Sequence, residues 1–155
     1  MNTWAKTVHR TDPRRRSARR LSRLIAVQAL YQWLLTAQDL GVVEAFLRES
    51  EDFANSDQEY FQACFLGAAR QAEQLRAQFQ PQLDRPLAQI SPVEHAILLL
   101  ATYELSAHPE VPYRVVINEA VELAKSLGGN EGHRYINGVL DRLWPSLRPH
   151  EPGHG

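Results

Sequence analysis

Apolar residues recur every three or four positions along most of this chain, which is the spacing of one face of an α-helix. The clearest stripe covers residues 57–80, with Cys64 on its apolar side, where a small buried side chain is expected rather than a nucleophile. Similar stripes predict helices over residues 14–38, 42–50, 92–107, 111–127 and 131–143, with one or two helical turns over 83–90. No stretch alternates with period two over a useful length, so we expect an all-α fold of about six or seven helices.

The helix over residues 92–107 has the most distinctive sequence. Ser91 suits an N-cap, Pro92 the first helical position, and Glu94 completes a capping box. Apolar residues surround this helix almost completely, so it is expected to be buried on most sides or to meet a partner. For the short helix over 42–50, Val43, Phe46 and Leu47 are the expected inward face.

Composition and length limit the domain organisation. We expect a flexible arm over residues 1–13, one helical domain over 14–144, and a disordered tail over 145–155, where three Pro and two Gly occur. The single Cys excludes an intramolecular disulfide, and the longest apolar run, Ala96 to Ala101, is far shorter than the ~20 residues that cross a bilayer. No secretory leader opens the chain, so we expect a cytoplasmic protein without a membrane contact.

The net charge of −1 conceals a strong separation of charge. The first 23 residues hold eight basic groups and one acidic group, a net charge of +7, whereas the rest hold nine basic and seventeen acidic groups, a net charge of −8. Arg16, Arg20 and Arg23 are spaced to share one face of the first helix. A basic arm on an acidic body indicates a polyanion partner, although a solvated basic terminus or an Arg-rich leader has the same composition.

Motifs for catalysis or metal binding are not evident. Gly128-Gly129 lacks the Lys-Ser/Thr of a phosphate loop, and the six His form no metal-binding pair at helical spacing. Glu119 and Glu122, close to Lys125, are interpreted as a solvated ion-pair edge. We therefore expect no enzyme activity, no cofactor and no metal site.

Ordered sequence blocks resemble the NusB family of bacterial transcription antitermination factors. The blocks run from the Arg14–Arg20 cluster and Ala26–Tyr31 through Ser91–Glu94, Tyr103–Leu105 and Val111–Tyr113 to Ile117–Lys125 and Tyr135–Asp141. The resemblance implies two three-helix-bundle-like halves. It also implies binding of the boxA element of ribosomal RNA leaders together with NusE, a small ribosomal subunit protein, and entry into the elongating RNA polymerase complex.

Single-stranded RNA requires cations for its phosphates and flat side chains for its bases. At positions that match those through which the NusB family is thought to meet RNA, the resemblance implies these RNA-binding residues: Arg16, Arg19, Arg20, Arg23, Gln28, Tyr31, Arg134, Tyr135 and Asn137. For Tyr31 a place in the core, and for Asn137 a packing or capping role, are equally open. The expected partner-binding residues are Glu94, Leu98 and Leu99; Leu99 stands where the family commonly has a basic residue, which indicates a changed interface, a homodimer or deeper burial.

Two alternatives stay open at this point. A similar helical module occurs as the RNA-binding domain of ribosomal RNA cytosine methyltransferases, which would add an enzymatic domain. The chain is alternatively a homodimer whose interface covers the basic face.

Overall fold

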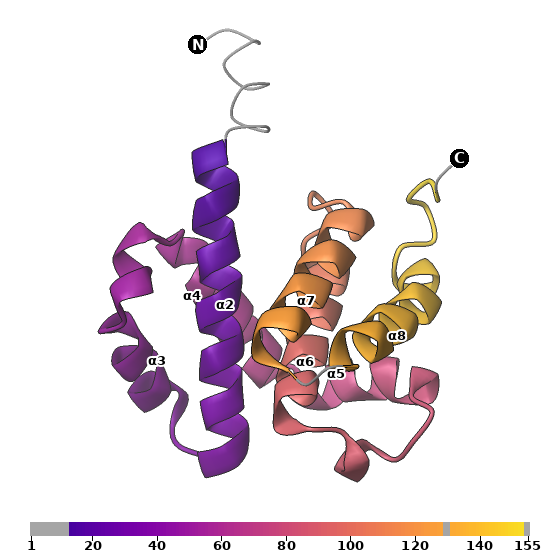
Figure 1. Ribbon diagram of the computed structural model, residues 1–155, viewed down its shortest axis with the longest axis horizontal. Helices are drawn as coiled ribbons and strands as arrows, with labels where there is room; N and C mark the ends of the chain where they lie inside the picture. The colour runs from indigo at the N-terminus through magenta and orange to yellow at the C-terminus, as the bar shows by residue number, and fades with distance from the viewer. Residues whose placement is uncertain (1–12, 129–130, 154–155) are drawn as a thin grey trace, which may run out of the picture.

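The computed structural model describes residues 13–128 and 131–153, and in these residues the fold is all-α (Figure 1). Seven α-helices and three short 3-10 helices occur in this part of the chain, which confirms the expected fold class. The α-helices are α2 (Pro13–Thr36), α3 (Leu40–Arg48), α4 (Gln58–Arg70), α5 (Ala72–Phe79), α6 (Pro92–Ala107), α7 (Tyr113–Leu127) and α8 (Gly132–Leu147). The 3-10 helices are η1 (Glu51–Asn55), η2 (Gln80–Gln82) and η3 (Leu87–Gln89). The expected arm over 1–13 lies outside the described residues except for Pro13, which begins α2.

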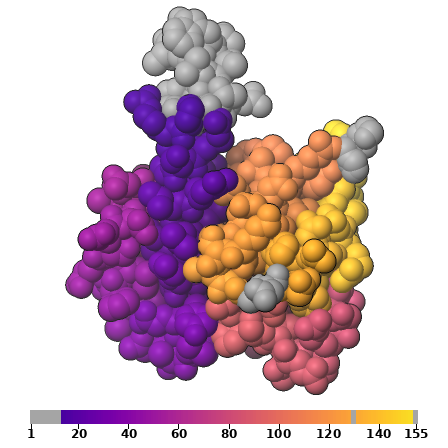
Figure 2. All heavy atoms as spheres, viewed as in Figure 1, coloured from indigo at the N-terminus to yellow at the C-terminus, as the bar shows by residue number. Residues whose placement is uncertain are grey.

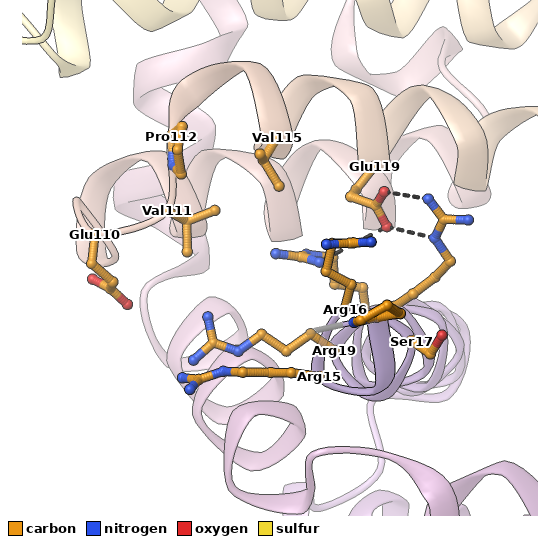
Figure 3. A pocket seen from close by; sticks show the side chains of 12 residues that line it. Arg15, Arg16, Ser17, Arg19, Glu110, Val111, Pro112, Val115 and Glu119 are labelled. Atoms are coloured by element: carbon orange, nitrogen blue, oxygen red, sulfur yellow. Dashed lines mark hydrogen bonds and ion pairs between the residues drawn. The ribbon is translucent and has the colours of Figure 1, made fainter. Parts of the chain in front are cut away.

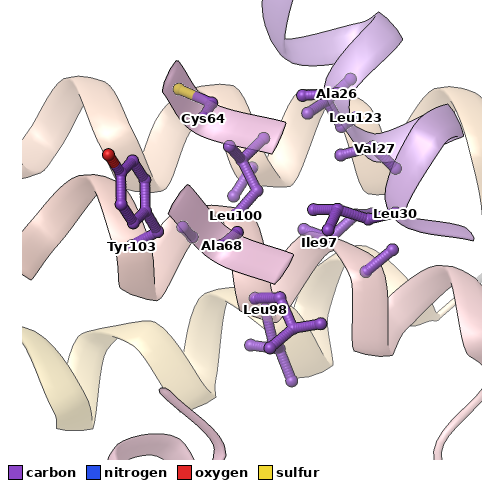
Figure 4. Packing of buried hydrophobic residues seen from close by; sticks show 14 of the residues in the cluster. Ala26, Val27, Leu30, Cys64, Ala68, Ile97, Leu98, Leu100, Tyr103 and Leu123 are labelled. Atoms are coloured by element: carbon purple, nitrogen blue, oxygen red, sulfur yellow. The ribbon is translucent and has the colours of Figure 1, made fainter. Parts of the chain in front are cut away.

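Helix α6 lies at the centre of the molecule. It packs against α2 and α4 on one side and against α5, α7 and α8 on the other, so the two three-helix halves share it as a common wall (Figure 1). Leu98 and Leu99 are fully buried in α6, and Figure 4 shows Leu98, Leu100 and Tyr103 within the packed interior. The nearly all-apolar surface of α6 is therefore explained by burial on every side.

The predicted start of α6 is confirmed in detail. The Ser91 hydroxyl accepts a hydrogen bond from the Glu94 amide, and a Glu94 carboxylate oxygen accepts one from the Ser91 amide, both at 3.1 Å. Pro92 occupies the first turn, where its missing N–H leaves no helical bond unmade.

The single helix expected over residues 57–80 is in fact two helices. Helix α4 ends at Arg70 and α5 begins at Ala72, and Gln71 between them has φ −103° and ψ 16°. The apolar spacing continues across this break because α4 and α5 both face α6. Cys64 lies in the core with no exposed surface, as expected, and burial raises the pKa of its thiol well above the ordinary value.

Residues 145–153 contradict the expected disordered tail. Helix α8 continues through Pro145 to Leu147, and Arg148 is buried. The Arg148 guanidinium donates to the backbone oxygens of Leu105 at 2.7 Å and Val111 at 2.8 Å, and it also pairs with Glu151. Glu151 in turn accepts a hydrogen bond from the Tyr113 amide at the start of α7. These residues are ordered despite their Pro/Gly-rich composition, because one buried cation satisfies several carbonyls at the end of α6 and in the loop before α7.

None of the helices in residues 13–128 and 131–153 has a long enough apolar stretch to cross a membrane.

Candidate nucleic-acid interface

The N-terminal half of α2 and the start of α7 enclose a groove of about 950 Å³ whose charged wall consists mainly of arginines (Figure 3). Side chains from both helices and from the loop before α7 line it: Pro13, Arg15, Arg16, Ser17, Arg19, Arg20, Arg23, Glu110, Val111, Pro112, Val115 and Glu119. In the space-filling view α2 forms the surface between the α3–α4 side and α7, and its N-terminal end projects beyond the body (Figure 2). We refer to this feature as the arginine groove.

The exposed arginines of the groove come from successive turns of α2. Arg15 and Arg16 are exposed near its beginning, and the Arg20 side chain is 64% exposed although it is paired. Arg20 makes two hydrogen bonds to the Glu119 carboxylate, at 3.0 and 2.7 Å, and this bidentate contact raises the pKa of the Arg20 guanidinium. Glu119 thus holds Arg20 in a fixed orientation, and a guanidinium can bind a phosphate with the same fork of two donors.

Glu119 is a groove residue whose contact with α2 the sequence interpretation missed. The expected edge pair exists, with Lys125 Nζ 3.3 Å from Glu122, but the Glu119 side chain is only 14% exposed and faces α2. Besides Arg20, it lies 3.8 Å from Arg23. Its position within the Ile117–Lys125 block was the sequence feature that could have indicated a role for Glu119. An argument from charge pairs along one helix does not use that feature.

Arg19 lies partly inside the wall. Its side chain is 22% exposed, its Nε is 3.6 Å from Asp57, and its guanidinium lies 4.2 Å from the centre of the Tyr60 ring. Stacked over an aromatic face, Arg19 is fixed at the floor of the groove rather than extended into solvent.

The structure contradicts the expectation that Arg23 contacts RNA phosphates beside Arg16 and Arg20. The Arg23 side chain is 5% exposed and makes three hydrogen bonds of 2.9 to 3.1 Å to Glu104, whose other donor is the Tyr60 hydroxyl. Burial opposes the charged form, but the Glu104 carboxylate outweighs this and raises the pKa of Arg23. Burial, followed by the negative charge of Glu104, likewise raises the pKa of Tyr60. Arg23 therefore stabilises the contact of α2 with α4 and α6 and is enclosed by its partners.

The remaining expected RNA-binding residues lie outside the arginine groove. Gln28 and Tyr31 are exposed farther along α2, and 37% of Tyr31 is accessible, so Tyr31 is not a core aromatic. Arg134 and Asn137 are exposed on the first turns of α8, where each contacts an acidic neighbour: Glu131 at 3.5 Å and Asp141 at 3.4 Å.

Tyr135 is covered on one face by the guanidinium of Arg85, 4.2 Å from the ring centre. Burial, with the nearby Asp84 carboxylate, raises the pKa of the Tyr135 hydroxyl. The stack shows that this ring accepts a flat cation on its face, which is the same geometry that an unstacked base would use.

The expected partner-binding residues divide into two groups. Glu94 is partly exposed at the start of α6, and its carboxylate also faces Gly132, where an added Cβ would lie 3.1 Å from a carboxylate oxygen. Leu98 and Leu99 are in the core, so they do not form a surface in this structure, and deeper burial explains Leu99. Among the described residues no group of three or more His, Cys, Asp or Glu is placed to hold a metal ion.

Comparisons with known proteins agree on one family. The model of the NusB family matches residues 20–144. The transcription antitermination protein NusB of Nitrosospira multiformis is 54% identical over 131 residues, covering 84% of this chain and 83% of that protein. Its counterpart in Bordetella pertussis is 51% identical over 140 residues, covering 88% and 91%.

Two solved structures share the fold. The NusB of T. maritima superposes with a TM-score of 0.71 at 28% identity, covering 85% of this chain and 90% of that chain. A chain from a crystal structure of the antitermination factors NusB and NusE in complex with dsRNA gives a TM-score of 0.72 at 22% identity, covering 82% and 96%.

Proposed function

Because the chain belongs to the NusB family, we propose that it acts in transcription antitermination by binding boxA RNA together with NusE and joining the elongating RNA polymerase complex in the cytoplasm. The observation that carries this proposal is the arginine groove, which is the most basic surface formed by α2 and adjoins the Ile117–Lys125 block through Glu119. The proposal assigns no catalytic step to the chain.

Within this proposal, Arg15, Arg16 and Arg20 neutralise phosphates along the first turns of α2. Without RNA, Glu119 holds Arg20 in place. When RNA binds, a phosphate replaces Glu119 as the partner of Arg20, which is accessible because its side chain is largely exposed. Outside the groove, hydrogen bonds and stacking surfaces come from Gln28 and Tyr31 on α2 and from Arg134, Tyr135 and Asn137 on α8. Glu94, at the exposed start of α6, is the proposed contact with NusE.

The test is a titration of labelled boxA RNA and a scrambled RNA, with and without NusE, at several salt concentrations. Neutralising three phosphates of a single strand, one each by Arg15, Arg16 and Arg20, gives a slope of log K against log salt of about −2. Replacing Arg16 and Arg20 by Ala reduces the slope by about 1.4 if each contacts one phosphate. Arg70→Ala, an exposed arginine on α4 that does not line the groove, is the matched control. Equal binding of both RNAs under all conditions contradicts the proposal.

The two alternatives predict different results. The relatives that match are named antitermination proteins and are matched over most of their length, which supports an adaptor rather than the RNA-binding domain of a methyltransferase. A homodimer that covers the basic face predicts that boxA RNA dissociates it in sedimentation experiments.

A further inference from the structure

A second surface, formed by α3 and the C-terminal half of α2, has the opposite chemistry. Helix α3 places Val43 and Leu47 in the core, yet Val42 and Phe46 point outward, with 53% and 62% of each residue exposed. Phe46 was expected to face inward, and the structure contradicts this. Because Val42 and Phe46 are four residues apart, they form an apolar stripe on the solvent side of the helix.

The outward stripe of α3 borders the C-terminal half of α2. Phe46 and Leu47 line a hollow of about 420 Å³ together with Gln28 and Gln32 from α2 and Glu49 and Ser50 from the end of α3. Leu35, one turn beyond Gln32 on α2, is 56% exposed. We call Leu35, Val42 and Phe46, with this hollow, the α3 patch. Three large apolar side chains exposed on adjoining helices are unusual for a surface without a partner.

The charge around the α3 patch disfavours a phosphate backbone and favours a basic partner. No Lys or Arg occurs from Leu24 to Leu47, and between Asp39 and Asp52 the chain carries five carboxylates against one guanidinium, that of Arg48. Arg48 is itself paired with Glu44 at 2.7 Å. Glu49 lies at the edge of the hollow beside Phe46. Phosphates would be repelled here, whereas cations beside an apolar stripe are complementary.

From these observations we infer that the α3 patch is a docking surface for an amphipathic helix of a partner protein, with aliphatic residues on one face and Lys or Arg at its flanks. Its aliphatic side chains cover Val42 and Phe46 and enter the hollow between α2 and α3, as in helix-in-groove recognition. The flanking cations pair with Glu49 and its acidic neighbours. The hollow of this surface shares no residue with the arginine groove and does not include Glu94. Gln28 at its edge is also a proposed RNA contact, so the variants below leave Gln28 unchanged.

The test uses a synthetic helical peptide of about 20 residues, long enough to hold a helix, with leucines on one face and lysines elsewhere. The control peptide has glutamate in place of every lysine. Fluorescence anisotropy with the whole protein should show saturable binding of the lysine peptide that weakens with salt, and binding of the glutamate peptide at least about tenfold weaker.

Two sets of variants locate the contact. Val42→Ser with Phe46→Ser removes apolar area that binding would bury, so peptide affinity should fall by about tenfold or more while boxA RNA affinity stays unchanged. Glu49→Gln should flatten the salt dependence. Val115→Ser, which changes another exposed apolar residue, lines the arginine groove instead and should leave peptide binding as in the wild type.

Several results would overturn the inference. They are an absence of peptide binding, equal binding of both peptides, or peptide binding that Val42→Ser with Phe46→Ser does not change. A fall in boxA RNA affinity in this double variant would assign the patch to RNA. A wild-type dimer that the double variant converts to a monomer in sedimentation would assign it to a second copy of the chain. Failure of RNA binding in the wild type contradicts only the proposed function.

Discussion

The buried pair of Arg23 and Glu104 gives the sharpest prediction about this molecule. Replacing Arg23 by Met keeps the length of the side chain but removes the cation that faces Glu104. The Glu104 carboxylate is then left with one neutral donor, the Tyr60 hydroxyl, in a site where its side chain is only 2% exposed. Breaking a buried pair by removing one partner is more damaging than replacing both, because an uncompensated charge remains in the interior.

The expected loss follows from this geometry. Three hydrogen bonds of 2.9, 3.1 and 3.0 Å disappear, and a buried carboxylate loses its counter-ion. Losses of about 3–5 kcal/mol in the free energy of unfolding are typical of such changes, which is a large part of the ~5–15 kcal/mol that stabilises a domain. Glu104→Leu alone should cost a similar amount. The double variant should be less destabilised than the sum of the two by at least about 2 kcal/mol, since the charges disappear together.

Urea unfolding followed by circular dichroism measures all four members of this double-mutant cycle. At urea concentrations below its unfolding transition, where it is folded, the Arg23→Met protein should bind boxA RNA with nearly wild-type affinity. Arg20→Ala should instead weaken RNA binding. A loss under about 1 kcal/mol with additive effects would refute the buried pair. Equal losses of RNA affinity for Arg23→Met and Arg20→Ala would show that Arg23 contacts RNA after all.

Three further predictions concern other parts of the fold. Gly67→Ala, which normally stabilises a helix, should lower the free energy of unfolding by about 1–3 kcal/mol in urea denaturation, because the new Cβ would lie 2.3 Å from the Tyr103 ring; unchanged stability would contradict this packing. His95 accepts a hydrogen bond from Arg76 at 2.9 Å, and burial followed by the Arg76 charge lowers its pKa to about 4. The unfolded chain therefore binds this proton first, stability falls as the pH drops from about 6.5 towards 4, and an NMR titration that gives an ordinary His95 pKa would refute the contact. Arg148→Ala should lower the thermal midpoint through a loss of about 2–4 kcal/mol, because buried carbonyls lose a charged donor; a midpoint within error of the wild type would mean that residues after α8 are not anchored.

Much of the fold could be predicted because its signals are local. The capping box of Ser91 and Glu94 lies within four residues, and the stripe that carries Cys64 repeats every three or four residues along α4 and α5. The arginine-rich face of α2 was visible for the same reason. Features of this kind depend on spacing along the chain, which the sequence states directly.

The errors concern contacts between residues that are distant in sequence. Arg16, Arg20 and Arg23 share a face by spacing, but only the position of Glu104 on α6 determines that Arg23 is enclosed. The anchoring of Arg148 depends on carbonyls at the end of α6 and in the loop before α7, which composition does not reveal. Phe46 and Leu47 are adjacent apolar residues on a short helix, and no periodicity decides which of them turns outward.

Glu104 has a consequence for the order in which the chain can fold. Its carboxylate accepts hydrogen bonds from Arg23 of α2. Its backbone oxygen accepts one, at 3.2 Å, from Nη2 of Arg148, which follows α8. During synthesis, Arg23 emerges before Glu104, so their ion pair cannot form until α6 has left the ribosome. The Glu104 and Leu105 carbonyls at the end of α6 can accept their hydrogen bonds only after Arg148, which follows α8, has been synthesised. The two halves are joined through Glu104, which contacts Arg23 of α2 and Arg148 after α8. A fragment that ends before α6 would therefore lack the carboxylate that pairs with Arg23.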